Sequence, residues 1–246
     1  MSERADLLLV RKGLAPSREK AQALILAGLV YSGERRIEKA GQKVDEEAPL
    51  EVRGRACPYV SRGGLKLEGA LDALSLPVEG LVCADVGAST GGFTHCLLSR
   101  GARRVYAVDV GKGQLHERLR RDPRVVSREG VNARYLSEDF FPEPVDLVVV
   151  DASFISLRLL LPAIRRAAPS AAVLALVKPQ FEAGRRAVGK GGVVRDDAVR
   201  WGAVRAVVEA AEVLGYTAQA AVESPVKGPK GNAEIFLFLK AGGASP

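Results

Sequence analysis

The chain has 246 residues, of which 47% are hydrophobic and 26% charged, so it can build one large domain or one small and one medium domain. Its net charge of +7 suggests an anionic partner, with nucleic acid the first candidate. The N-terminal apolar run is too short for a signal peptide, and no stretch approaches the roughly 20 apolar residues of a membrane helix. We therefore expect a cytoplasmic protein with no membrane partner.

The three cysteines exclude two further classes of protein. Cys57, Cys83 and Cys96 are odd in number, lie far apart and form no Cys-x-x-Cys pair. This spacing argues against a disulfide framework and against a zinc site. We expect reduced thiols and no bound metal.

Residues 1–54 have the pattern of a small α+β domain. A helix over 6–12 is followed by a second helix, which Ser17 caps and Gly28 ends. Residues 29–37 then turn as a hairpin, and 48–54 supply a closing strand. Two helices and a small sheet make up the whole predicted domain.

The charge of this first segment is balanced, with 11 Lys and Arg against nine Asp and Glu through Arg55. An RNA-binding surface would therefore require basic residues segregated onto one face. The candidates are Arg4, Arg11, Arg18, Lys20, Arg35 and Arg36. Charge alone leaves an ordinary solvated surface equally open.

The same segment resembles the S4 RNA-binding domain. The family pattern G-L-x-x-S-R-x-x-A-x-x-L-I-x-x-G-x-V is matched by Gly13, Leu14, Ser17, Arg18, Ala21, Leu24, Ile25, Gly28 and Val30. The turn carries Ser32 where that family usually has Asn, which is a conservative change for a turn. The resemblance implies binding to structured RNA through phosphate contacts and shape.

After a linker at 55–60, residues 61–246 alternate apolar strands with helical patterns. The predicted strands are 81–86, 104–110, 124–127, 145–151, 171–178, 217–223 and 234–240. The predicted helices are 64–75, 92–100, 112–121, 157–168 and 196–214. This alternation indicates an α/β fold with an open, doubly wound, Rossmann-like sheet, and the last two strands should form a hairpin at one edge.

A glycine turn between the first strand and helix is the candidate cofactor site. It comprises Gly87, Ser89, Thr90, Gly91, Gly92 and Phe93. Asp85 ends the first strand and Asp109 the second, where a carboxylate can hold a ribose diol. The turn lacks G-x-G-x-x-G spacing, which favours S-adenosylmethionine over NAD, although a turn used only for packing stays open. Asn132 is either an adenine contact or an ordinary turn residue.

Transfer of a methyl group to a hydroxyl needs a positioned base. The two histidines, His95 and His116, lie on predicted helices away from strand ends, so they are poor candidates. Asp151 and Lys178 each follow a buried apolar strand, and a lysine placed there can act as the base.

With Lys66 and Glu234, these two residues resemble the K-D-K-E tetrad of the FtsJ-like RNA 2′-O-ribose methyltransferases. The segments YVSRGGLKLEGAL, DVGASTGGFT, DLVVVDASFISL, LVKPQFEAGR, GKGGVVRD and GNAEIFL extend the similarity over nearly the whole chain to the TlyA family, which also carries a hemolysin label. The resemblance implies S-adenosylmethionine-dependent 2′-O-methylation of cytidine in ribosomal RNA. It implies that Lys178 is the base, that Asp151 and Lys66 orient the hydroxyl, and that Glu234 completes the network.

Basic residues near the tetrad are candidates for contacts to RNA phosphates, although solvated loops would show the same pattern. They are Arg62, Arg185, Lys190 and Lys227. Ribosomal RNA or a ribosomal subunit is the expected partner. The alternatives are a non-catalytic RNA-binding or ribosome-assembly protein, against which the complete tetrad argues, and a membrane-active hemolysin, against which the lack of a membrane segment argues.

Overall fold

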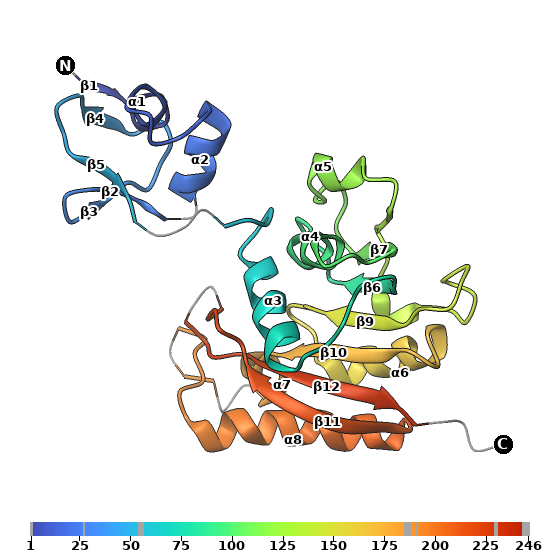
Figure 1. The fold of residues 1–246 in the computed structure, drawn as a ribbon. Helices are drawn as coiled ribbons and strands as arrows, with labels where there is room; N and C mark the ends of the chain where they lie inside the picture. Colours follow the sequence, from blue (N-terminus) through green and yellow to red (C-terminus); the bar gives the residue numbers. More distant parts are fainter. Residues whose placement is uncertain are drawn as a thin grey trace. The chain divides into compact units, whose positions relative to one another are not determined.

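The computed structural model describes residues 2–26, 28–53, 57–184, 188–189, 191–228 and 231–242. The chain divides into two compact units, Met1–Pro58 and Tyr59–Pro246, which we call the N-terminal unit and the catalytic unit. Figure 1 shows the elements of each. Within the described residues, no helix is both long and apolar enough to cross a membrane.

The N-terminal unit contains the two predicted helices and the predicted hairpin. Its elements are β1 (Ser2–Arg4), α1 (Ala5–Arg11), α2 (Arg18–Leu26), β2 (Val30–Ser32), β3 (Arg35–Arg36), β4 (Lys43–Asp45) and β5 (Leu50–Val52). The sheet has the order β3-β2-β5. Ser17 caps α2 as predicted, because its hydroxyl accepts the N–H of Lys20 at 3.2 Å. The additional pair β1–β4 was not predicted, since each strand is three residues long.

The catalytic unit is built on a seven-stranded sheet of order β11-β12-β10-β9-β6-β7-β8. The strands are β6 (Val82–Val86), β7 (Arg104–Asp109), β8 (Val125–Glu129), β9 (Leu147–Val150), β10 (Ala172–Val177), β11 (Tyr216–Glu223) and β12 (Ile235–Ala241). The five strands from β10 to β8 pair in parallel, whereas β12 is antiparallel to both of its neighbours. The predicted doubly wound sheet with an edge hairpin is confirmed.

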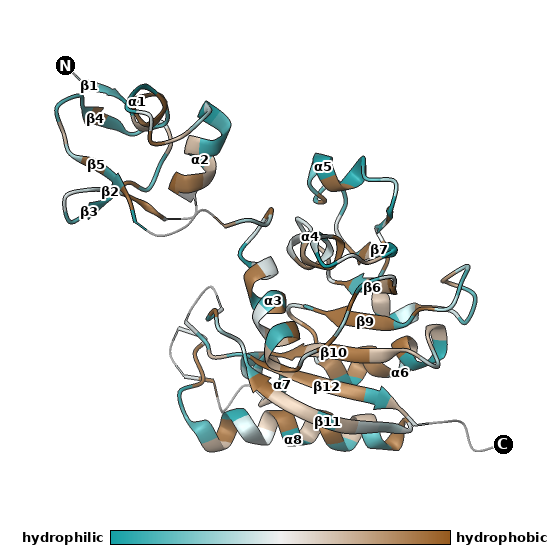
Figure 2. Cartoon of the chain, viewed as in Figure 1, coloured by the Kyte–Doolittle hydropathy of each residue, from teal (hydrophilic) through white to brown (hydrophobic). Residues whose placement is uncertain are grey.

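Helices cover both faces of this sheet. They are α3 (Gly63–Ala73), α4 (Gly92–Ser99), α5 (Glu117–Arg120), α6 (Leu157–Ala167), α7 (Pro179–Glu182) and α8 (Asp197–Val213), with the 3-10 turn η1 at Ala133–Tyr135. Alternate strand residues pack against α6 and α8 on one face and against α3 and α4 on the other. Figure 2 shows the resulting apolar central strands. The sheet therefore has a core on each side, as a doubly wound fold requires.

The predicted helix over 112–121 is largely wrong, because only Glu117–Arg120 is helical. Gly113 has a φ of +66°, a backbone that breaks a helix. The Glu129 carboxylate then accepts three backbone N–H groups, those of Gly113 at 2.8 Å, Gln114 at 3.0 Å and Leu115 at 3.2 Å. These bonds replace the helical ones and lower the pKa of Glu129.

Candidate active site

The glycine turn connects β6 to α4 at the carboxyl edge of the sheet. Gly87 and Gly91 have φ values of +87° and +93°, which glycine adopts without strain. A Cβ placed on Gly87 would lie 2.5 Å from the backbone oxygen of Asp151. The turn therefore lies directly against the end of β9, and a side chain at Gly87 would separate the two.

Asp85 lies beneath the turn as a fully buried carboxylate. Its Oδ2 accepts the N–H of Thr94 at 2.8 Å and the hydroxyl of Thr94 at 2.7 Å. Its Oδ1 is buried and has no partner among the described residues. Burial raises the pKa of Asp85 to about 7, and the nearby charges of Asp151 and Asp109 add to the shift. An unsatisfied buried acceptor is a place for an ordered water or a ligand donor.

Asp109 accepts backbone hydrogen bonds on the other side of the turn. Its Oδ2 accepts the N–H of Ser89 at 2.8 Å and its Oδ1 that of Gly111 at 2.7 Å. Ser89 and Thr90 are exposed, so the turn presents polar groups to solvent. Phe93, in contrast, is buried and stacks on Phe236 with ring centroids 5.9 Å apart, which places it in the core.

Asn132 has the turn role that the sequence left open. It caps η1, where its side-chain oxygen accepts the N–H of Arg134 at 3.1 Å. The side chain is exposed and lies just after β8.

The four tetrad residues form two ion pairs, in which Lys66, Lys178 and Glu234 are buried and Asp151 is partly exposed. Lys178 Nζ lies 2.5 Å from Asp151 Oδ1 and also donates to Ser153 Oγ at 2.8 Å. Lys66 Nζ lies 2.6 Å from Glu234 Oε2. Only 7% of Lys178 and 8% of Lys66 is exposed, so both ammonium groups depend on their carboxylates.

Strand register places these residues at one edge of the sheet. Val177 pairs with Ile235, so Lys178 and Glu234 stand at the same end of β10 and β12. Val150 pairs with both Val86 and Ala175, which sets Asp151 between the glycine turn and β10. The structure thus brings the candidate base and the candidate cofactor turn together.

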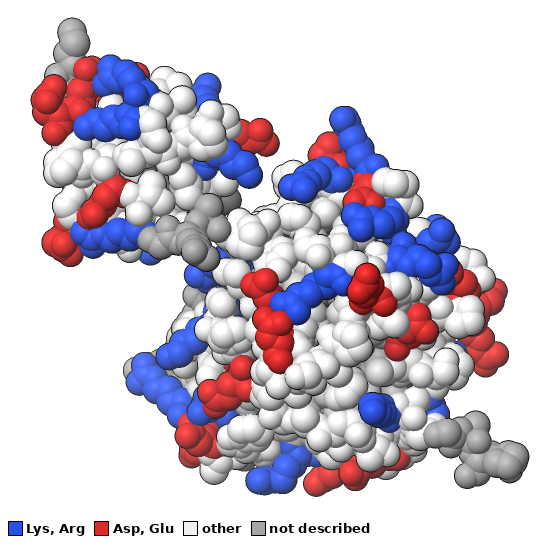
Figure 3. Space-filling model, viewed as in Figure 1, with Lys and Arg blue, Asp and Glu red and all other residues white. Residues whose placement is uncertain are grey.

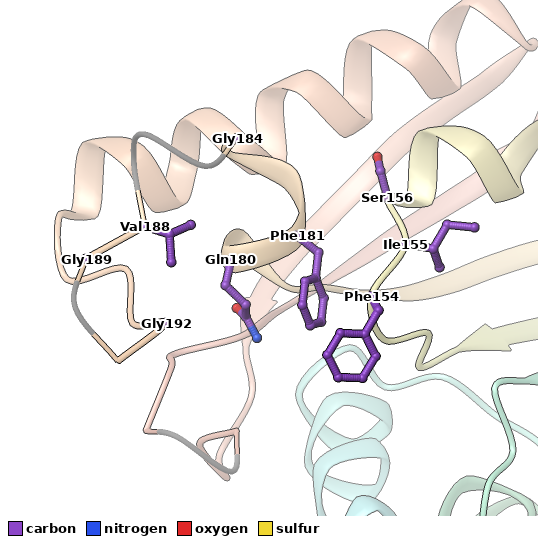
Figure 4. A pocket seen from close by; sticks show the side chains of 9 residues that line it. All are labelled: Phe154, Ile155, Ser156, Gln180, Phe181, Gly184, Val188, Gly189 and Gly192. Carbon is purple, nitrogen blue, oxygen red and sulfur yellow. The ribbon is translucent and has the colours of Figure 1, made fainter.

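A pocket of about 570 Å³ is lined by Phe154 and Gln180, which lie three and two residues after Asp151 and Lys178, together with their neighbours in the chain. Its walls are the segments that follow β9 and β10 and the loop beyond α7, as Figure 4 shows. Phe154 and Phe181 lie against each other on one side of it, with ring centroids 5.2 Å apart and planes tilted by 46°. Phe154 is 90% exposed and has a φ of +65°, an unusual combination for a large aromatic residue.

Sequence reasoning missed two side chains that hold this pocket together. Glu182 of α7 accepts the Ser156 hydroxyl at 2.6 Å and the N–H of Leu157 at 2.7 Å, which ties the two walls to each other. Asn232 accepts the N–H of Val194 at 2.9 Å and donates to the carbonyl of Gly192 at 2.9 Å. The structural role of each side chain follows from its burial and hydrogen bonds. No local sequence pattern predicts it.

The basic residues predicted to bind RNA are spread over both units. Arg4 and Arg18 meet at the buried carboxylate of Asp6, with Nε–O distances of 3.0 Å and 2.9 Å. Arg11 is paired with Glu3 and Glu46, and Arg36 with Glu38. All of these residues that the structure describes are exposed, and Lys20, Arg35, Arg62 and Lys227 form no ion pair within the described ranges. Arg185 and Lys190 lie outside the described residues.

The structure places no metal-binding cluster in its described ranges, since no three His, Cys, Asp or Glu side chains there could hold an ion together. Cys83 and Cys96 are buried in the catalytic unit, and burial raises the pKa of each thiol to about 12. His95 is buried in α4, and His116 caps α5 through Nδ1.

Comparison with known families gives two matches. The FtsJ-like methyltransferase family matches residues 59–241, and the S4 domain family matches residues 3–49.

Curated relatives match almost the whole chain. The 16S/23S rRNA (cytidine-2′-O)-methyltransferase TlyA of Mycobacterium tuberculosis is 48% identical over 96% of this chain and 89% of its own length. Hemolysin A of Brachyspira hyodysenteriae is 41% identical over 96% of this chain and 99% of its own length.

Solved structures agree with the observed fold. A Streptococcus thermophilus protein that carries a provisional hemolysin name has a TM-score of 0.78 and 42% identity, covering 98% of this chain and 89% of that one. An S-adenosylmethionine-dependent methyltransferase from Mesorhizobium loti has a TM-score of 0.52 at 16% identity, covering 70% and 96%. The second likeness concerns the fold alone.

Proposed function

The chain belongs to the FtsJ-like methyltransferase family and carries an S4 domain before it, and from this we propose that it methylates the 2′-hydroxyl of a cytidine in ribosomal RNA. Its methyl donor is S-adenosylmethionine. The observation that carries the proposal is the ion pair of the buried Lys178 with the partly exposed Asp151, next to the glycine turn. The 2′-hydroxyl, the cytidine and the ribosomal target are proposed by similarity to the TlyA relatives.

The residues around the turn fit the cofactor. The turn at Gly87 has no room for a side chain, Asp85 keeps an unpartnered buried oxygen there, and Asp109 offers a carboxylate to a ribose diol. Asn132, which follows β8 and caps η1, would in this proposal also contact the adenine with its exposed side chain. When bound, S-adenosylmethionine supplies an electrophilic methyl group on a sulfonium.

Lys178 is the general base of this proposal. After its ammonium has released a proton to solvent, the Nζ of Lys178 would accept the proton of the 2′-hydroxyl as that oxygen receives the methyl group that the bound cofactor would supply. Asp151 at 2.5 Å and Ser153 at 2.8 Å then stabilise the ammonium that results. Proton transfer and charge stabilisation are thus assigned to neighbouring groups on β9 and β10.

Lys66 and Glu234 position the substrate in this scheme. Their 2.6 Å pair lies at the same strand ends and gives the hydroxyl a further donor and acceptor. The pocket formed after β9 and β10 has two aromatic rings, Phe154 and Phe181, against which a base would stack. The nucleotide would therefore be held by its base and its ribose at once.

The partner in this proposal is ribosomal RNA within a ribosomal subunit, which places the protein in the cytoplasm. The N-terminal unit, with Arg4 and Arg18 presented by Asp6, would contact RNA phosphates.

Transfer of labelled methyl from S-adenosylmethionine to separated, unmodified ribosomal subunits tests this function. Wild type, Lys178→Ala and the exposed control Lys240→Ala would be compared, and the product nucleoside identified. We expect 2′-O-methylcytidine from wild type and the control, and a loss of at least 100-fold in Lys178→Ala, in keeping with the loss of a general base.

Cofactor binding by Lys178→Ala, measured by calorimetry, establishes that the variant is folded. A folded Lys178→Ala that still transfers methyl at the wild-type rate would exclude Lys178 as the base. Methyl transfer to a nucleobase would exclude the proposed 2′-hydroxyl.

A further inference from the structure

The positive charge of this protein is concentrated in one short segment. Residues 100–135 contain ten Lys and Arg against four Asp and Glu, a balance of +6 in a chain whose total is +7. The N-terminal unit, in contrast, carries only a small excess of basic residues. Most of the electrostatic attraction for an anionic partner therefore comes from the catalytic unit.

The segment forms one edge of the sheet. It comprises β7, α5, β8 and η1, and β8 is an outermost strand that pairs only with β7. Glu129 fastens the backbone before α5 to the end of β8 through its three hydrogen bonds. Figure 3 shows Lys and Arg side chains gathered around α5, so the charge of the segment forms a surface, which we call the β8 edge.

Four cations of the β8 edge form no ion pair within 4.0 Å in the described ranges, although Arg118 is close enough to Asp122 to lower the pKa of that carboxyl. They are Lys112, Arg118, Arg128 and Arg134, all exposed. Two neighbouring arginines do form ion pairs, Arg121 with Glu117 at 2.8 Å and Arg124 with Asp122 at 2.8 Å. The four unpaired side chains are available to bind phosphate.

An aromatic side chain lies among these cations. Tyr135 is 71% exposed, and the guanidinium of Arg134 lies 5.9 Å from its ring centroid. Arginines interleaved with an exposed aromatic ring are typical of nucleic-acid surfaces, where phosphates and unstacked bases are bound together.

We propose that the β8 edge is a second RNA-binding surface, which holds the phosphate backbone of ribosomal RNA independently of the N-terminal unit and of the tetrad. This inference rests on the proposed function for the identity of the RNA. A simpler explanation of the charge is that it protects the edge strand β8 from aggregation. That protection needs only a few charges of either sign, so it does not explain an excess of six positive charges. A membrane surface would require an apolar face beside the basic one, whereas this segment exposes only Val110 and Tyr135 among its large apolar side chains.

The test compares two double variants with the same change of charge. Arg118→Gln/Arg128→Gln alters the β8 edge but leaves Lys112 and Arg134, which are nearer Asp109 and Asn132, intact. Arg205→Gln/Lys240→Gln is the control, because both residues are exposed, lack ion pairs in the described structure and belong to α8 and β12, on the opposite side of the sheet. Full-length protein is used throughout.

Binding to unmodified ribosomal subunits is measured against salt concentration. Each lost phosphate contact lowers the slope of log affinity against log salt by about 1, so we expect the β8-edge variant to lose about 2 and the control almost nothing. The KM for subunits should rise in the β8-edge variant, with kcat and cofactor affinity unchanged.

Equal slopes for the two double variants would overturn the proposal. So would a β8-edge variant that keeps its RNA slope but loses binding to phosphatidylglycerol vesicles, because that result would identify a membrane surface. If wild type binds subunits but transfers no methyl group, the proposed function fails, whereas the slopes still decide whether this edge contacts RNA.

Discussion

Replacement of Asp6 by Asn should loosen the N-terminal unit. Asp6 is fully buried, and its oxygens accept two hydrogen bonds from Arg4 at 3.0 Å each, one from Arg18 at 2.9 Å and one from Gln22 at 2.9 Å. These donors lower the pKa of Asp6 well below its usual range. Asn keeps one acceptor oxygen, loses the charge and turns a donor toward a guanidinium.

The magnitude follows from the number and exposure of these bonds. A charge-assisted hydrogen bond contributes about 1.5–3 kcal/mol when buried. The Arg4 and Arg18 side chains are 44% and 55% exposed, so solvent screens much of that gain. We expect a total loss of about 2 kcal/mol in the free energy of unfolding of the N-terminal unit. For so small a unit this is a large fraction of the whole.

Hydrogen exchange of the α1 amides in the full chain measures this loss. A change of about 2 kcal/mol corresponds to roughly 30-fold faster exchange. Glu38→Gln is the matched control, because it removes one negative charge from an exposed pair, 3.6 Å from Arg36. Unchanged exchange in Asp6→Asn, or an equal change in both variants, would refute the reasoning.

The same prediction has a pH dependence. Because the folded pKa of Asp6 lies below that of an unfolded carboxyl, about 3.9, its contribution is present above that pH and is lost as pH falls further. The protection of the α1 amides, measured relative to the intrinsic exchange rate at each pH, should fall in wild type below pH 4, whereas the Asp6→Asn variant should lack this step.

Three further predictions concern the catalytic unit. Gly87→Ala should lower the free energy of unfolding by about 3 kcal/mol and reduce cofactor affinity, because the new methyl group would combine a positive φ with a clash against the Asp151 carbonyl. The control Gly80→Ala has a φ of +76° and no neighbour within 4 Å, so it should lower the free energy of unfolding by about 1 kcal/mol. Equal losses for the two variants in chemical denaturation would contradict this prediction. Since the Asp85 pKa is raised to about 7, thermal stability should fall as pH rises from about 4 to 7, and a wild-type fall no steeper than that of Asp85→Asn would argue against it. Glu182→Gln should raise the KM for RNA about tenfold at unchanged cofactor affinity, because the mutation weakens a charge-assisted bond between the pocket walls; weaker cofactor binding would locate its effect elsewhere.

Much of the catalytic unit could be predicted because its strands are buried on both faces. The apolar run before the glycine turn became β6, and the run before Lys178 became β10, each within two residues of the predicted bounds. Strand ends also located Asp151 and Lys178, since parallel strands bring their carboxyl ends to one edge. The apolar run and the polar residue at its end can be recognised in each strand separately, without knowing which strands pair with it.

Features that depend on distant partners could not be predicted in the same way. The helical pattern over 112–121 was overridden by Glu129, which follows in a later strand and takes the N–H groups that a helix would use. Glu182 and Asn232 look like ordinary polar residues in the sequence. Only the structure shows that Glu182 bonds to Ser156 in the other pocket wall and that Asn232 holds the loop at Gly192 and Val194. Asp6, likewise, gains its role from Arg4, which precedes α1, and Arg18, which begins α2.

The separation of Lys66 and Glu234 along the chain affects when the enzyme becomes competent during its synthesis. The two residues are 168 positions apart, and Glu234 arrives with β12, the strand that also completes the pairing of β10 and β11. A nascent or truncated polypeptide lacking β12 would already contain the N-terminal unit, the glycine turn and Lys178. It could therefore engage RNA while its active site was incomplete, so methyl transfer would begin only after the last strand had joined the sheet.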